Sequence, residues 1–297
     1  MMGTPRVSVL MPAYNASATV AEAVASALAQ TVAELEVIVA DDGSAEPIAP
    51  ALEGIADERL RVVRRPRNGG VSAARNTALA LARAPLVAQL DADDLWREDH
   101  LEYLLGAFED PLIGLAYANV EIVGYAGSDR WIAARAPGDG LARWIGDSAE
   151  HPVNDLRRLY RANPIPAPGV VMRTEAVRAV GGYPEWLRVG EEYTLYIRLR
   201  RAGWQFAYVD RRTATYRWPE PGRGATFNVR RSSRQEVKQF LVLALSSPPE
   251  LALYNGLWLR LVHMLTTHVP ATVSIAQRLR AIARALRPRG GKRRRES

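Results

Sequence analysis

Short apolar runs alternate with amphipathic segments over the first 120 residues of the chain. Runs of this kind, bounded by turn residues, are typical of buried strands. Strands are predicted over residues 6–11, 35–40, 60–63, 86–90 and 113–123, and helices over 19–30, 47–56, 71–83 and 98–108. The alternation predicts βαβ units, a mainly parallel sheet and right-handed crossovers.

The pattern weakens in the middle of the chain and then recovers. Residues 124–160 are rich in glycine and show little periodicity, so we interpret them as a variable segment that faces the substrate, with a helix near 154–162. Regular elements return after Pro168. Strands are predicted at 170–173 and 206–209, and helices at 174–180 and from Glu191 to just before Gly203.

Polar side chains follow three of the predicted strands, at the point where each strand ends. Pro12-Ala13-Tyr14 follows the first, Asp41-Asp42 the second, and Asp91-Ala92-Asp93-Asp94 the strand at 86–90. The carboxyl ends of parallel strands meet at one edge of a sheet, where ligands bind. Clustered carboxylates suit a divalent cation that bridges to phosphates. The alternative is a solvated loop that caps the following helix.

The composition is that of an ordinary globular protein, and its charge is unevenly distributed. The 297 residues include 48% hydrophobic and 24% charged residues. The chain contains no cysteine, which excludes disulfides and thiolate metal sites. The net charge is +7, but ten basic residues and a single acid follow Glu250. The N-terminus has no basic and apolar leader pattern, so we expect a cytoplasmic protein.

The C-terminal segment combines an apolar face with basic charge. Ile275, Leu279, Ile282 and Leu286 share one face of a predicted helix, and a cluster from Arg289 to Arg295 follows. Such a helix suits an anionic membrane surface, which would attach the protein peripherally to the inner face of the membrane. A helix packed on the preceding domain, with a solvated basic end, explains the pattern equally well. Nucleic-acid binding is disfavoured because aromatic residues are not interleaved with the basic ones.

Six short stretches carry a resemblance to a known family. They include Asn68-Gly69-Gly70, Leu90-Asp91-Ala92-Asp93-Asp94, Gly181-Gly182-Tyr183 and Gly190-Glu191-Glu192, and they occupy residues 7–15, 37–44, 68–76, 90–94, 181–183 and 190–195. In their order and spacing the chain resembles the family 2 glycosyltransferases. The resemblance covers roughly residues 6–217, and coincidence would have to produce all six stretches in order.

The resemblance implies an α/β fold of the GT-A type, Rossmann-like, with a mostly parallel central sheet flanked by helices. It implies a glycosyltransferase domain over residues 1–225. Residues 1–120 would form its nucleotide-binding half and residues 121–225 its acceptor and catalytic-base half. Residues 226–297 would form a helical, basic C-terminal extension.

The resemblance also implies an activity. The family transfers a sugar from a nucleotide sugar to an acceptor hydroxyl with inversion, and a UDP-sugar is our first choice of donor. A saccharide or lipid-linked acceptor in cell-envelope polysaccharide or glycolipid synthesis is expected. Pro12 and Tyr14 match the loop beside the base and ribose, Asp42 the carboxylate on the base edge, and Arg75 an arginine near the base and diphosphate.

The acidic motifs match the metal and the base of the family. Asp93 would hold Mg²⁺ or Mn²⁺ on the diphosphate, and Asp91 would lie near the ribose or donor sugar. Glu192 matches the catalytic base, with Glu191 as the alternate. The family usually has Glu-Asp here, so the base would be one methylene longer. The histidine that often follows the position of Tyr216-Arg217 is also absent.

Three other classes of protein fit the sequence less well than a glycosyltransferase. A dinucleotide-binding oxidoreductase requires a glycine-rich turn after the first strand, and residues 11–17 contain no glycine. A hydrolase with an aspartyl nucleophile at Asp91 usually has Thr or Val soon after the Asp pair, but Asp94-Leu95 follows. The runner-up is a non-catalytic protein of GT-A type that binds membrane or nucleic acid through its tail.

Overall fold

The computed structural model describes residues 4–123, 165–188 and 190–218, together with the single residues 156, 159 and 163. The chain divides into two compact units, Met1–Phe227 and Asn228–Ser297, and every described residue belongs to the first. The predicted C-terminal extension, most of the 124–160 segment and the helix near 154–162 therefore lie outside the described residues, apart from residues 156 and 159. None of the described helices has the length and apolar character needed to cross a membrane.

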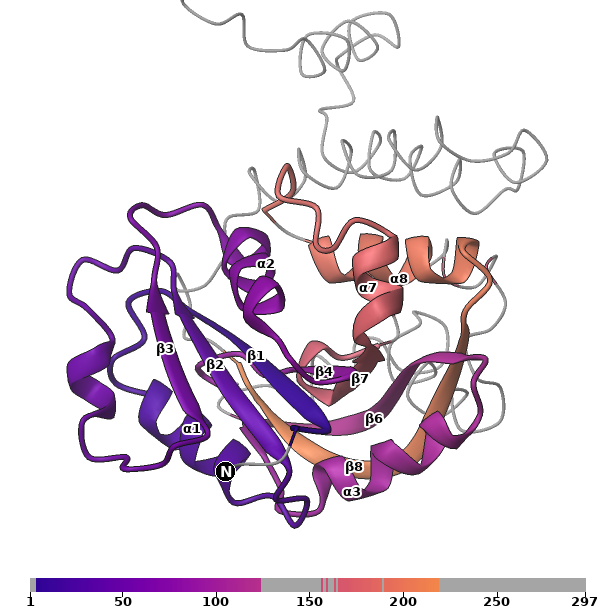
Figure 1. Cartoon of the computed structure of the whole chain (residues 1–297), viewed down its shortest axis with the longest axis horizontal. Helices are drawn as coiled ribbons and strands as arrows, with labels where there is room; N and C mark the ends of the chain where they lie inside the picture. The colour runs from indigo at the N-terminus through magenta and orange to yellow at the C-terminus, as the bar shows by residue number, and fades with distance from the viewer. Residues whose placement is uncertain are drawn as a thin grey trace, which may run out of the picture. The chain divides into compact units, whose positions relative to one another are not determined.

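An eight-stranded sheet in the order β3-β2-β1-β4-β7-β6-β8-β5 forms the centre of this unit (Figure 1). Its first half is entirely parallel, as the alternating pattern predicts. These strands are β1 (Val7–Ala13), β2 (Leu35–Asp41), β3 (Leu60–Arg64) and β4 (Leu86–Gln89). Every residue of β1, β2 and β4 is buried, which explains why these strands appear in the sequence as continuous apolar runs.

The second half of the sheet is mixed. The strand β7 is antiparallel to both of its neighbours, β8 is parallel to β6, and β5 is antiparallel to β8. These strands are β5 (Leu95–Trp96), β6 (Ile113–Val123), β7 (Val170–Arg173) and β8 (Gln205–Arg217). The predicted α/β fold with flanking helices is confirmed, with the parallel character concentrated at the N-terminal side.

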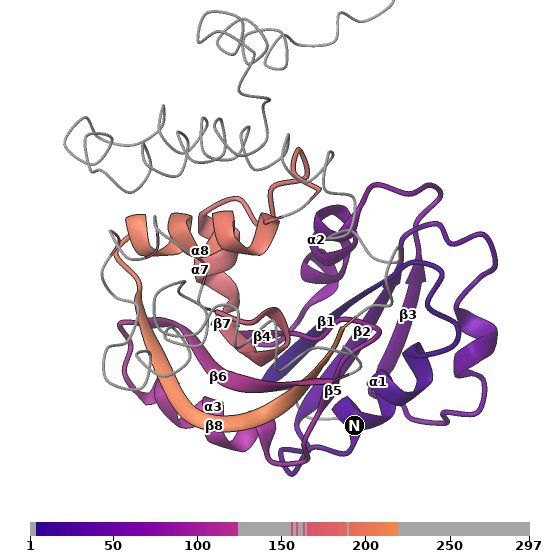
Figure 2. The ribbon, with the colours of Figure 1, turned by 180° about the vertical axis from the view of Figure 1, so that it is seen from behind.

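Helices cover both faces of the sheet. In the two ribbon views α2, α7 and α8 lie on one face and α1 and α3 on the other (Figures 1 and 2). The helices are α1 (Val20–Leu28), α2 (Val71–Leu81), α3 (His100–Leu105), α7 (Thr174–Ala179) and α8 (Glu191–Arg201). A buried apolar cluster includes Val24 of α1, Val37 of β2 and Leu104 of α3, which are fully buried. This packing anchors β1 and β2, whose ends carry the site.

Three elements differ from the prediction for identifiable reasons. The helix expected at 47–56 is only a 3₁₀ turn, Ala49–Leu52, because Pro47 and Pro50 restrict the backbone. The helix expected at 98–108 ends at Leu105 and continues as a 3₁₀ turn, Gly106–Glu109. The last strand extends to Arg217, well beyond residue 209, because its polar second half pairs with β6 and β5.

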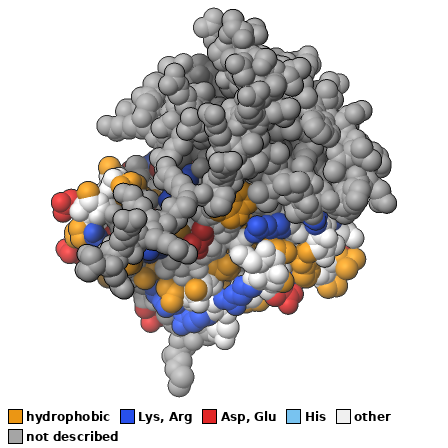
Figure 3. All heavy atoms as spheres, turned by 90° about the horizontal axis from the view of Figure 1, so that it is seen from above, with side chains coloured by type: hydrophobic (Ala, Val, Ile, Leu, Met, Phe, Trp, Pro, Cys, Tyr) orange, Lys and Arg blue, Asp and Glu red, His pale blue; other side chains and the backbone are white. Residues whose placement is uncertain are grey.

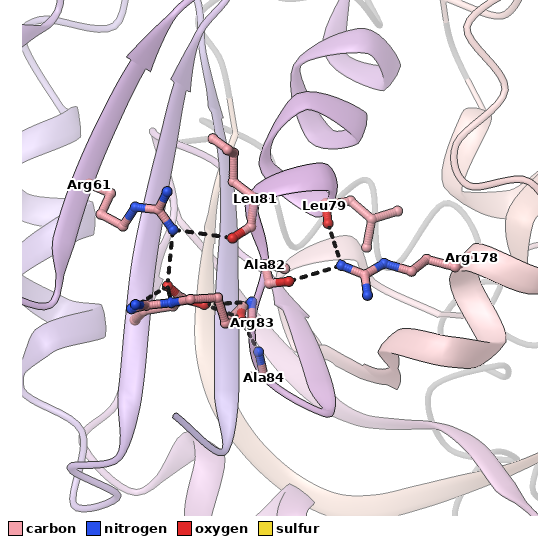
Figure 4. Close-up of polar contacts among 9 residues, drawn as sticks. Arg61, Leu79, Leu81, Ala82, Arg83, Ala84 and Arg178 are labelled. Atoms are coloured by element: carbon pink, nitrogen blue, oxygen red, sulfur yellow. Dashed lines mark hydrogen bonds and ion pairs between the residues drawn. The ribbon is translucent and has the colours of Figure 1, made fainter. Parts of the chain in front are cut away.

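A buried carboxylate fastens the end of the sheet opposite the polar strand ends. Glu36 of β2 is 1% exposed and accepts hydrogen bonds from Ser8 Oγ (2.7 Å) and from the backbone N–H of Arg83 (2.8 Å). The guanidinium groups of Arg83 and Arg61 complete its shell. Arg61 and Arg178 also donate to the last carbonyl groups of α2 (Figure 4). The cluster therefore fixes the connection from α2 to β4.

Glu36 should make stability depend on pH in the acid range. Burial alone raises the pKa of Glu36, but the hydrogen bonds from Ser8 and Arg83 outweigh it, so the pKa is lowered from 4.5. A depressed pKa stabilises the folded state above about pH 4.5, and this contribution is lost as the pH falls further. Glu36→Gln is expected to cost about 1.5–3 kcal/mol at pH 7 and less at pH 4.

Denaturant unfolding at both pH values measures this difference. Asp57→Asn is the matched control, because Asp57 pairs with Arg59 at a 25% exposed site and should be worth less than about 1 kcal/mol. A Glu36→Gln protein as stable as the wild type at pH 7 would contradict a stabilising role for the Glu36 carboxylate.

Candidate active site

The polar ends of β1, β2 and β4 meet at one edge of the sheet. Ala13 is in register with Asp41, and Leu10 is in register with Gln89. The backbone N–H of Asp42 also donates to the Ala13 carbonyl at 2.8 Å. The predicted binding-site residues therefore lie at, or just after, the ends of strands that end side by side: Pro12 to Tyr14, Asp42 and Asp91 to Asp94.

Asp42 is buried and held by the glycine turn of the Asn68-Gly69-Gly70 motif. Its carboxylate accepts hydrogen bonds from the backbone N–H groups of Gly69 (3.0 Å) and Gly70 (2.7 Å), and it pairs with the Arg65 guanidinium. Gly70 has φ +92, in the region that favours glycine, and is the N-cap residue that precedes α2. The cation beside Asp42 is Arg65, which the sequence analysis did not select, whereas Arg75 lies elsewhere.

Tyr14 and Pro12 occupy different environments. Tyr14 is 53% exposed, one of four large hydrophobic residues exposed among the described residues, and it presents a flat apolar ring to solvent. Pro12 is buried in β1. The turn after Tyr14 is fixed by Asn15, which has φ +53, accepts from the Ala45 N–H and donates its own N–H to Ser44 Oγ. An exposed ring on a fixed turn is suited to stacking a base.

The three aspartates after β4 have distinct surroundings. Asp91 pairs with Arg75 at 2.5 Å. Asp93 is exposed and has no hydrogen bond or ion pair to another described side chain. Asp94 is fully buried, and its Oδ1 accepts the Arg217 backbone N–H at 2.8 Å. Asp94 thereby ties the acidic turn to the end of β8, close to where the family's histidine was expected.

Electrostatics at this turn are unfavourable without a cation. Desolvation and the neighbouring Asp91 carboxylate raise the pKa of Asp93 to about 6, with Arg217 and Arg75 opposing them. Burial and the charges of Asp91 and Asp93 raise the pKa of Asp94 well above its usual range. The Oδ2 atom of Asp94 is buried with no hydrogen-bond partner among the described residues. Added positive charge at this turn would offset the repulsion between the carboxylates.

The donor set fits a divalent metal that is shared with a substrate. In the described part of the chain, no three His, Cys, Asp or Glu side chains are arranged to hold a metal by themselves. Mg²⁺ is commonly bound by one or two carboxylates together with phosphate oxygens and water. Asp93, which makes no hydrogen bond or ion pair to another described side chain, would be the protein ligand, and phosphate oxygens would complete the coordination.

Arg75 joins the acidic turn to the start of α8. It is 1% exposed, and its two terminal nitrogens contact Asp91 and Glu191, the latter at 3.0 Å. Burial alone lowers the pKa of Arg75, but the charges of Asp91 and Glu191 outweigh it and raise that pKa. The resemblance implies a position for this guanidinium beside the base and diphosphate. In the structure it lies between two carboxylates from opposite halves of the domain.

Glu191 and Glu192 begin α8 and have different partners. Gly190 precedes them with φ +74, and both acids lie in the first helical turn, where the helix dipole favours negative charge. Burial and the Glu192 carboxylate raise the pKa of Glu191, whereas Arg75 lowers it. The Oε2 atom of Glu192 is buried and has no hydrogen-bond partner among the described residues. Of the two acids, Glu191 is therefore the one whose carboxylate Arg75 holds.

Two motifs that are distant in the sequence contact each other directly. The side chain of Asn76, at the end of the Asn68 to Asn76 motif, donates to the Tyr183 carbonyl and accepts the Tyr183 N–H, both at 2.9 Å. Gly182 has φ +67, and a Cβ atom there would lie 2.7 Å from Asn76 Oδ1. Glycine is therefore required at this contact. The sequence showed both motifs but not that they meet.

Acidic, basic and hydrophobic side chains are intermixed among the described residues that are visible in the space-filling view from above (Figure 3). His100 is buried, hydrogen-bonds Thr213 Oγ1 at 2.7 Å and stacks on Trp96. Burial lowers its pKa to about 3, so it stays neutral and structural.

Comparison with known proteins identifies the class of protein that this fold and site define. The model of glycosyl transferase family 2 matches residues 8–177, more than half of the chain. ExoU, a succinoglycan biosynthesis protein of Rhizobium meliloti, is 35% identical over 206 residues, which are 68% of this chain and 59% of that protein. The chain belongs to glycosyl transferase family 2. It spans about three-fifths of the length of the first curated relatives it matches, 63% and 59%.

Solved structures of low sequence identity share the fold. TarS of S. aureus in complex with UDP matches with a TM-score of 0.59 and 18% identity, covering 95% of this chain and 70% of that one. The mannosyltransferase PcManGT of Pyrobaculum calidifontis, in complex with GDP-Man and Mn²⁺, matches with a TM-score of 0.62 and 22% identity, covering 95% and 80%. These matches confirm the GT-A fold expected from the sequence.

Proposed function

We propose that this protein is a metal-dependent, inverting glycosyltransferase that moves a sugar from a UDP-sugar to an acceptor hydroxyl. The observation that carries the proposal is the buried contact of Arg75 with both Asp91 and Glu191. It joins the acidic turn, the proposed donor side, to the first turn of α8, the proposed acceptor side. A transferase needs such a fixed separation because its two substrates must meet in one orientation.

The chemistry divides between these two sides. On the acceptor side, Glu192 accepts the proton of the acceptor hydroxyl as that oxygen attacks the anomeric carbon. On the donor side, the nucleoside diphosphate leaves from the opposite face, which inverts the anomeric centre. Asp93 would hold Mg²⁺ or Mn²⁺, which neutralises the charge that develops on the departing diphosphate. Arg75 holds Asp91 and Glu191 in place during this exchange.

A nucleotide sugar as the donor is supported by the site and by the structural neighbours. Tyr14 offers an exposed ring for the base, and Asp42 lies at the neighbouring strand end. TarS is seen with UDP and with UDP-GlcNAc, and PcManGT with GDP-Man and Mn²⁺. We choose uracil because a carboxylate such as Asp42 would accept a hydrogen bond from its N3–H group.

The acceptor is proposed to be a saccharide or a lipid-linked saccharide of the cell envelope. ExoU, named for succinoglycan biosynthesis, supports polysaccharide synthesis as the setting. Attachment to the inner face of the membrane would bring the site to a lipid-linked acceptor. The basic residues after Glu250 would supply that attachment.

A screen of nucleotide sugars with and without Mn²⁺ tests the proposal. Binding at 100 times Kd should stabilise the protein by about 2.7 kcal/mol, which raises the unfolding temperature by several degrees. We expect this rise with UDP only when Mn²⁺ is present, together with metal-dependent release of UDP from one UDP-sugar. Absence of both results for every nucleotide would refute the proposed glycosyltransferase activity and favour the non-catalytic alternative.

A further inference from the structure

Gln89 is a buried polar residue in the centre of the sheet, and it hydrogen-bonds two tyrosine hydroxyls. It lies in β4, two residues before Asp91, and is fully buried. Its Oε1 accepts a hydrogen bond from the Tyr183 hydroxyl at 2.6 Å. Its Nε2 donates to the Tyr196 hydroxyl at 2.8 Å and to the Ala167 carbonyl at 3.3 Å. The amide is thus satisfied on both sides.

Each tyrosine connects this amide to a different part of the proposed active site. The Tyr183 ring lies 5.5 Å from the Arg75 guanidinium, in cation–π contact, and Arg75 holds Asp91 and Glu191. Tyr196 lies on α8 four residues after Glu192, so the two side chains share one face of the helix. Burial raises the pKa of both phenols, so both keep their protons.

We propose that Gln89, Tyr183 and Tyr196 form a positioning network that fixes the first turn of α8 relative to the acidic turn after β4. The inference rests on the proposed function, because it assigns these residues to the geometry of that reaction. None of these three residues is proposed to contact the substrate. They act through Arg75, which Tyr183 supports, and through α8, which Tyr196 connects to β4.

The physical reason is the directionality of a buried hydrogen-bond network. Apolar side chains would fill the same space without the cost of removing polar groups from water. A satisfied polar network instead admits one arrangement of its members and leaves unpaired groups in any other. Here that arrangement spans β4, the turn at Gly181-Gly182-Tyr183 and the middle of α8, so it links β4 to two segments that are distant from it in the sequence.

Loss of one hydroxyl should lower turnover without weakening donor binding. In Tyr183→Phe and Tyr196→Phe, we expect kcat to fall about 10- to 100-fold, because a displacement of about 1 Å is sufficient for such losses. The KM for the nucleotide sugar should stay within about twofold, since neither hydroxyl contacts the donor. Tyr183→Phe combined with Gln89→Leu should be no slower than Gln89→Leu alone, because both act through one network.

Tyr193→Phe is the matched control. Tyr193 lies on the same helix, is 4% exposed, and its hydroxyl donates to the Leu159 carbonyl outside the network. Its loss should cost a similar amount of stability, about 1 kcal/mol, and leave kcat near the wild-type value. A fall in the kcat of Tyr193→Phe equal to that of Tyr183→Phe would overturn the proposal, since a general loss of rigidity in α8 would then explain both.

Amide hydrogen exchange of residues 190–196 provides a readout that does not depend on activity. The network predicts faster exchange at the first turn of α8 in Tyr183→Phe and Gln89→Leu than in the wild type and Tyr193→Phe. Equal exchange in all four proteins, or unchanged kcat in both Phe variants of the network, would overturn it. A wild-type protein that transfers no sugar would refute the proposed function, whereas the exchange rates would still decide whether the network positions α8.

Discussion

Glu192→Gln is expected to lower kcat by about 10²- to 10⁴-fold, which is the contribution of a general base. Glutamine keeps the shape and burial of the side chain but cannot accept the proton of the acceptor hydroxyl. Donor affinity and the KM for the nucleotide sugar should change little, because Glu192 belongs to the acceptor side. Steady-state rates of UDP release with the best donor of the screen measure the effect.

Glu191→Gln separates the two neighbouring acids. Glu191 Oε1 is held by Arg75 at 3.0 Å, whereas Glu192 Oε2 has no hydrogen-bond partner among the described residues. We therefore expect Glu191→Gln to lose much less turnover than Glu192→Gln. The reverse order would transfer the role of base to Glu191. Full activity in both variants would exclude the first turn of α8 as the source of the base.

The elements near the start of the chain could be predicted because their signals are local. The runs that became β1, β2 and β4 are buried on both faces, so their apolar residues are continuous and their ends agree with the structure within about two residues. The second half of β8 could not be found this way. It contains Asp210-Arg211-Arg212, exposed polar residues that form a strand only because β6 and β5 pair with it.

The residues of the candidate site were easier to select than their contacts. Asp91 and Asp93 could be chosen because acids at a strand end stand out in a sequence, and Glu192 because it matches the position of the family's catalytic base. Arg75 was also chosen, but a buried arginine between carboxylates cannot be inferred from spacing, since Glu191 lies 116 residues away. Gln89 gave no signal, because one polar residue in an apolar strand looks like a solvent-facing position until the tyrosines that satisfy it are located.

Asp93→Asn is expected to remove most metal-dependent activity. Neutralisation of charge on a leaving diphosphate is worth several kcal/mol, and about 4 kcal/mol corresponds to roughly a 10³-fold loss in kcat. Asparagine is close in shape to aspartate but is a weaker ligand for Mg²⁺ or Mn²⁺. Calorimetric titration of UDP should therefore show much weaker binding in the presence of Mn²⁺ and little change in its absence.

In the metal-free protein, the stability of Asp93→Asn distinguishes loss of a metal ligand from general destabilisation. Asp91, Asp93 and Asp94 repel one another, so Asp93→Asn should raise the unfolding temperature at pH 7 while turnover falls. Asp110→Asn, in an exposed loop before β6, should change neither quantity. Retention of Mn²⁺-dependent UDP binding in Asp93→Asn would move the metal to another carboxylate. Asp91, which is 27% exposed whereas Asp94 is fully buried, would then be the next ligand to test.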